Sequence, residues 1–125
     1  MTMVYYVVRP TAPSVTVTAP LVDGSPITTL ATCSTSGFRP KLINVTWQLQ
    51  GGSIEVMADT STVRNGVDNT FSVTSEYRRV VSNIDNGKTL MCTVNHETLH
   101  VPLSMAVVLD ISCNKPFLSH LACSY

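Results

Sequence analysis

The sequence has little charge and no concentrated basic surface. Only 13% of its 125 residues are charged, and eight basic and eight acidic residues balance to a formal net charge of zero. Lysine and arginine form no run anywhere in the chain. Nucleic-acid binding depends on clustered cations that displace counterions from phosphates. The composition therefore argues against a nucleic-acid partner.

Long apolar runs are also missing from the sequence. No stretch approaches the roughly 20 apolar residues of a membrane-spanning helix, so we predict no membrane span in this chain. The opening MTMVYYVV is too short for the apolar core of a signal peptide, and no small-residue cleavage site precedes Pro10. We expect either an intracellular protein or a piece of a longer one.

Cysteine is sparse, and its spacing excludes the common small motifs. Cys33, Cys92, Cys113 and Cys123 include no C-x-x-C pair. This argues against a zinc ribbon and against a thioredoxin-like redox motif. Four cysteines allow three disulfide connectivities, and their number and spacing alone do not choose among them.

Threonine, serine and valine are abundant instead, in short segments that suit half-buried strands. Residues 14–19 and 43–49 alternate polar and apolar side chains, and residues 70–81 are rich in β-branched and aromatic types. Further strands are predicted over residues 27–34, 54–57, 88–95 and 101–111, and Gly37 and Pro40 are expected to end the first of these. Roughly seven or eight short strands at this spacing predict an all-β sandwich or barrel.

Three residues narrow the choice of sandwich. Cys33 lies on the predicted second strand, Trp47 on the third and Cys92 on the penultimate one. Where two sheets lie about 10 Å apart, a disulfide can bridge facing strands and an indole can pack against it. The spacing fits this arrangement, and the alternative is two unrelated cysteines with a core tryptophan.

Around these residues the sequence resembles the immunoglobulin superfamily, constant-like set, over residues 14–110. The segment LMCTVNH at residues 90–96 looks like the family's C-x-V-x-H on strand F. Residues 70–80 (TFSVTSEYRRV) are similar to the E–F region of nectins and poliovirus-receptor-like molecules. Residues 31–37 (ATCSTSG) are similar to strand B of nectins and of B7 co-stimulatory ligands. Leu90 departs from the pattern, because the family places a tyrosine two residues before the second cysteine.

The resemblance implies an immunoglobulin-like, two-sheet Greek-key β-sandwich. It also implies a buried disulfide between Cys33 and Cys92, stacked on Trp47 in the core. Cys113 and Cys123 either pair with each other or stay free.

The same resemblance predicts the domain organisation. Residues 1–13 are expected to be the end of a preceding domain or a linker, with a disordered leader as the alternative. Residues 14–111 are expected to form the constant-type domain, and residues 112–125 an irregular C-terminal tail.

The segment His96-Glu97-Thr98-Leu99-His100 spells the H-E-x-x-H signature of zinc metalloproteases. That signature needs a helix, which brings both histidines to one metal ion. Here a strand pattern runs up to Asn95 and Pro102 follows at once, which predicts a hairpin loop. A third ligand would have to come from Asp110 or His120. We therefore predict no metal site, no cofactor and no enzyme activity, with a zinc-dependent hydrolase as an outside alternative.

Strand parity places two further side chains. Asn44, in the N-x-T sequon at residues 44–46, falls on the face opposite Trp47 and is predicted to carry a glycan if the chain is secreted. Arg79 shares its face with apolar residues of the long predicted strand, and its head is expected to snorkel into solvent at the strand end.

The resemblance implies a non-catalytic extracellular module of a cell-surface adhesion or immune receptor, acting in protein–protein recognition or as a spacer. A B7-like co-stimulatory ligand is the alternative. The implied partners are other cell-surface proteins, such as nectin-like or immune receptors, with homophilic contact included. The implied location is the cell surface, as part of a longer membrane-anchored protein.

Overall fold

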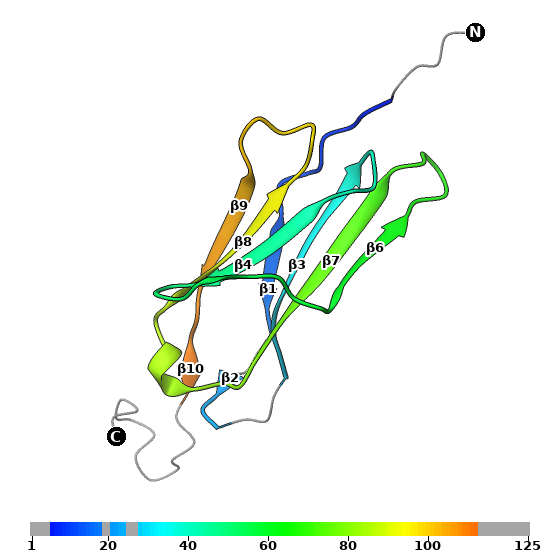
Figure 1. The fold of residues 1–125 in the computed structure, drawn as a ribbon. Coiled ribbons are helices and arrows are strands. Elements are labelled where there is room, and N and C mark those ends of the chain that lie inside the picture. The colour runs from blue at the N-terminus through cyan, green and yellow to red at the C-terminus, as the bar shows by residue number, and fades with distance from the viewer. Residues whose placement is uncertain (1–5, 19–20, 25–27, 113–125) are drawn as a thin grey trace, which may run out of the picture.

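A computed structural model describes residues 6–18, 21–24 and 28–112, and its two main sheets face each other across a shared core (Figure 1). The first sheet contains, in spatial order, β1 (Ser14–Val17), β3 (Thr28–Phe38), β7 (Phe71–Arg79) and β6 (Thr60–Arg64). The second contains β5 (Ile54–Glu55), β4 (Asn44–Leu49), β8 (Thr89–Asn95) and β9 (Leu103–Val108). All strand pairs within these two sheets are antiparallel.

One end of the sandwich carries the smaller elements. β2 (Leu21–Val22) pairs in parallel with β10 (Ile111–Ser112), and the 3₁₀ turn η1 (Asn83–Asp85) lies beside them. Within the described residues, no helix is long and apolar enough to cross a membrane. The strand order confirms the predicted all-β Greek-key sandwich of the immunoglobulin type.

The prediction that Gly37 ends its strand was wrong. β3 continues to Phe38, with a register shift between Ser36 and Phe38 that marks a β-bulge. Gly37 has a φ of +74°, which glycine adopts without steric cost. The bulge returns Phe38 to the interior, where it is fully buried and pairs with Phe71.

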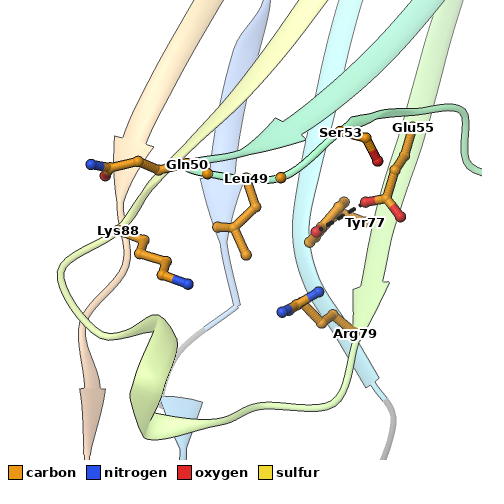
Figure 2. A pocket seen from close by; sticks show the side chains of 9 residues that line it. Leu49, Gln50, Ser53, Glu55, Tyr77, Arg79 and Lys88 are labelled. Carbon is orange, nitrogen blue, oxygen red and sulfur yellow. Dashed lines mark hydrogen bonds between the residues drawn. The ribbon is translucent and has the colours of Figure 1, made fainter.

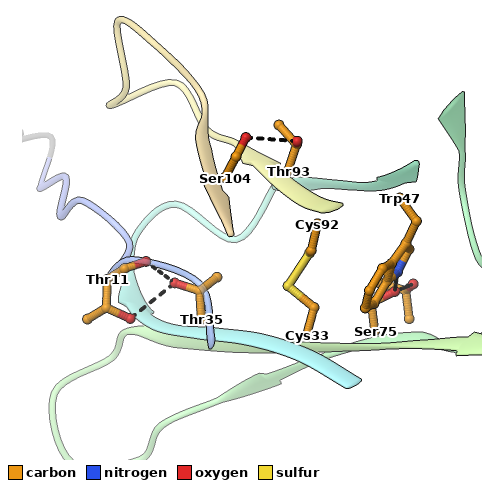
Figure 3. Close-up of a disulfide and its surroundings, with 9 residues drawn as sticks. Thr11, Cys33, Thr35, Trp47, Ser75, Cys92, Thr93 and Ser104 are labelled. Carbon is orange, nitrogen blue, oxygen red and sulfur yellow. Dashed lines mark hydrogen bonds between the residues drawn. A yellow bond between two sulfur atoms is a disulfide. The ribbon is translucent and has the colours of Figure 1, made fainter. Parts of the chain in front are cut away.

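A disulfide joins the two sheets through the core, and a buried indole packs beside it (Figure 3). Cys33 on β3 and Cys92 on β8 form a disulfide with a Cα–Cα distance of 6.5 Å. Trp47 on β4 is fully buried, and its Nε1–H donates to the Ser75 Oγ at 2.9 Å. The Tyr77 ring lies 5.3 Å from the indole. A buried N–H without a partner is costly, so Ser75 makes an interior position acceptable for this side chain.

The segment before β1 packs against the sandwich. Val8 and Arg39 exchange two backbone hydrogen bonds of 3.0 Å, and Thr11 N–H donates to the Ser36 carbonyl at 3.0 Å. The prolines Pro10 and Pro13 are buried. The Arg39 guanidinium also lies 5.8 Å from the centre of the Tyr6 ring, so the described residues before β1 contact the domain. The assignment of residues 1–13 to a linker or preceding domain stays a prediction. The predictions for Cys113, Cys123 and His120 lie outside the described residues.

Candidate functional site

The H-E-x-x-H segment lies in the hairpin loop between β8 and β9. The Leu99 N–H donates to the His96 carbonyl at 2.9 Å and closes a turn there. The segment has no helical conformation, so the two histidines do not share a helical face. His96 is buried and His100 is exposed.

Both ring nitrogens of His96 are used inside the protein. Its Nδ1 accepts from the Thr98 backbone N–H at 3.2 Å, because an amide can only donate. Nε2 therefore carries the proton of the neutral ring and donates to the Pro40 carbonyl at 2.8 Å. The ring also meets Phe38 edge-on, with centroids 5.5 Å apart. His96 thus ties the hairpin to the segment after β3, and is not a free metal ligand.

Arg79 stays 40% exposed at the strand end, and its head also forms an ion pair that the sequence did not predict. Its Nε lies 3.0 Å from Oδ2 of Asp85, a carboxylate that is only 2% exposed. Lys88 Nζ approaches the other carboxylate oxygen at 3.1 Å. The hydrogen bond to Asp85 raises the pKa of Arg79 above its ordinary value. Asp85 was missed because a carboxylate beside a turn glycine looks solvent-exposed in sequence.

The cations of this ion pair also line a pocket of about 530 Å³ (Figure 2). Tyr77 O–H donates to Oε2 of Glu55 at 3.3 Å in its wall, and burial, followed by the Glu55 charge, raises the Tyr77 pKa. Arg79 and Lys88 also line the pocket, and both hold the Asp85 carboxylate. The two cations of the lining are therefore held by Asp85, and Glu55 accepts a hydrogen bond from Tyr77.

The outward side of the second sheet is a surface without charged side chains. Successive side chains of a strand point to opposite faces of the sheet. The set that includes the buried Trp47, Cys92 and Val94 faces the core, so the residues between them and their cross-strand partners face outward. We call it the uncharged face, and its members are Asn44, Thr46, Gln48, Ile54, Thr89, Met91, Thr93, Asn95, Ser104, Ala106 and Val108. Thr93 and Ser104 share a hydroxyl hydrogen bond of 2.9 Å on it (Figure 3).

The outward side of the first sheet differs in charge. Arg78 forms ion pairs there with Asp59 and Glu76, among exposed hydroxyl side chains such as Thr74. Cores of protein–protein interfaces are depleted of charged residues. The uncharged face is therefore the better candidate for a recognition surface.

Asn44 lies at one end of the uncharged face. The first residue of β4, it is exposed and stands directly opposite Asn95 on β8. This placement leaves the sequon amide accessible at the surface. Glycosylation at this position stays a prediction.

The described chain enters and leaves the sandwich at opposite ends (Figure 1). Val8 pairs with Arg39 at one end. The neighbouring Pro40 is hydrogen-bonded to His96 of the β8–β9 hairpin, so this hairpin lies at the same end. β10 and Ser112 lie at the other end, beside β2 and η1. A chain that continued at both ends would be extended by the full length of the sandwich.

Comparison with known proteins gives one family match. The model of the CD80-like C2-set immunoglobulin domain matches residues 11–102. Human natural cytotoxicity triggering receptor 3 ligand 1 is 40% identical over 78 residues, which cover 57% of this chain and 17% of that protein. The chain thus spans well under two thirds of the length of this relative.

Two solved structures share the fold. A D1–D2 structure of Rst superposes with a TM-score of 0.70 at 15% identity, over 84% of this chain and 50% of that one. The full Ig1–Ig3 ectodomain of mouse nectin-like molecule 4 gives a TM-score of 0.73 at 24% identity, over 86% of this chain and 35% of that one. At these identities the likeness concerns the fold alone.

Proposed function

Because the chain belongs to the CD80-like C2-set immunoglobulin domain family, we propose that it is a non-catalytic, extracellular spacer module of a cell-surface ligand. In this role it holds a recognition domain of the same protein away from the membrane. The human relative is by name a receptor ligand, and this chain spans only part of such a protein. The proposal places the module in a longer, membrane-anchored chain, with other cell-surface proteins as partners and no cofactor.

The observation that carries the proposal is the position of the two ends. The chain passes through the sandwich from the Val8 end to the Ser112 end (Figure 1). The disulfide and the buried indole between them resist shear of one sheet against the other. A rigid domain with attachment points at opposite ends keeps the segments on either side a fixed distance apart, as a spacer must.

A second candidate function is direct recognition of a partner, including a second copy of the chain. The uncharged face favours it, because this face resembles an interface core in its lack of charge. Met91 lies near the middle of that face, on the central strand β8. A charge placed at Met91 would be buried without a partner in such a complex.

Surface plasmon resonance separates the two functions. The chain is immobilised and exposed to two analytes. One is the ectodomain of natural cytotoxicity triggering receptor 3 from the organism that encodes this chain, and the other is a soluble second copy of the chain. The spacer proposal predicts no saturable binding of either analyte. Saturable binding that falls about tenfold or more in Met91→Arg, and is unchanged in Thr74→Arg on the opposite sheet, would overturn it in favour of recognition.

A further inference from the structure

A groove of about 410 Å³ crosses the Asn44 end of the uncharged face. This volume falls within the range of about 300–1,000 Å³ that is typical of small-molecule sites. Its lining is uncharged and includes Val56 and Pro102 as apolar side chains, with Thr93 and Asn95 as polar ones. Val56 is 77% exposed, which leaves most of its apolar surface without a partner in the described protein.

The acceptor residue of the sequon is itself part of the groove wall. Asn44 and Thr46 both line it, and they share one face of β4. Asn95 stands directly opposite Asn44, and Thr93 stands directly opposite Thr46. The first sugar attached to Asn44 would therefore lie directly at the groove.

We infer that the groove holds the first N-acetylglucosamine of an N-linked glycan on Asn44. The inference rests on the proposed extracellular function, because the chain must pass through the secretory pathway. The Asn44 Nδ2 bonds to the anomeric carbon of the sugar and loses one proton, and the leaving group is the lipid diphosphate of the oligosaccharide donor. The apolar ring face packs on Val56, and the acetamide meets Asn95 and Thr93 with its methyl group toward Pro102.

The glycan would also cover an open strand edge. β5 pairs with β4 only at Trp47 and Gln48, so residues 44–46 have no strand partner on that side within the described part of the chain. Unpaired edges invite association with other chains. A sugar over this edge, and over the adjoining uncharged face, keeps a spacer module from sticking to its neighbours.

Nuclear magnetic resonance tests the placement directly. The full chain is secreted from eukaryotic cells behind an added leader, and its glycan is trimmed to one N-acetylglucosamine. We expect nuclear Overhauser effects between the sugar and the side chains of Val56 and Pro102. A sugar that is attached but tumbles freely overturns the inference. Secretion with Asn44 unmodified by mass spectrometry overturns it too, yet leaves the spacer proposal standing.

Thermal melting provides a matched control. The trimmed glycoprotein is expected to melt about 2 °C or more above the Asn44→Gln variant. This gain should disappear in a Val56→Ser background and persist in a Val63→Ser background. Val63 is 62% exposed and does not line the groove. A gain that is equal in both backgrounds, or absent from the parent, contradicts packing in the groove.

Discussion

Replacing both Cys33 and Cys92 by alanine is expected to lower the free energy of unfolding by about 4 kcal/mol. The bridge closes a loop with a sequence separation of 59, which restricts the unfolded chain in the entropy model. Its removal also leaves a gap between the sheets beside the buried Trp47 (Figure 3). Because Trp47 is the only tryptophan, its fluorescence during urea denaturation measures the loss.

The matched control keeps the cysteines and removes only the bond. The parent chain reduced under the same conditions should lose nearly as much stability as the double variant, since both lose the same cross-link. A loss below about 1 kcal/mol in the double variant would mean that the loop-closure account fails for this domain.

Arg79→Met is expected to lower the free energy of unfolding by about 2 kcal/mol, the size of a hydrogen bond to a charged group. The variant keeps the apolar stem but leaves the Asp85 carboxylate, 2% exposed, with Lys88 as its remaining cation. The loss is smaller than for a fully buried pair because the Arg79 side chain is 40% exposed and Lys88 still compensates the Asp85 charge. Urea denaturation at neutral pH measures the effect.

Its neighbour provides the control for that experiment. Arg78 pairs with Asp59 and Glu76, and all three side chains are substantially exposed. Arg78→Met should therefore cost less than about 1 kcal/mol. Equal losses in the two variants would show that burial of Asp85 does not set the strength of the Arg79 pair.

The fold could be predicted because a strand that is buried on only one face alternates apolar and polar residues along the sequence. Residues 43–49 alternate so strictly that β4 and its inward Trp47 followed directly, and the same logic placed Cys92 on β8. β6 was missed because an edge strand that is mostly exposed has little apolar periodicity. Gly37 was misread because one glycine can either end a strand or form a bulge, and the choice depends on the partner strand.

The candidate surfaces were harder to predict from sequence. The uncharged face depends on register between strands such as β4 and β8, which are separated by about forty residues in the chain. The position of Pro102 correctly predicted that His96 does not lie in a helix. The hydrogen bond from His96 to Pro40 is a tertiary contact, and no local sequence pattern predicts it. Long-range contacts of this kind are fixed by packing, and a linear pattern does not encode them.

The spacer account is tested most directly by the distance between membranes. In cells that carry the longer ligand, a tandem second copy of residues 8–112 should widen the gap to a receptor-bearing membrane. The nine residues of β7 alone span about 30 Å, so a widening of at least this size is expected in electron tomography. Affinity for soluble receptor should stay unchanged. An unchanged gap, or receptor binding that is lost or doubled with the added copy, would contradict the account.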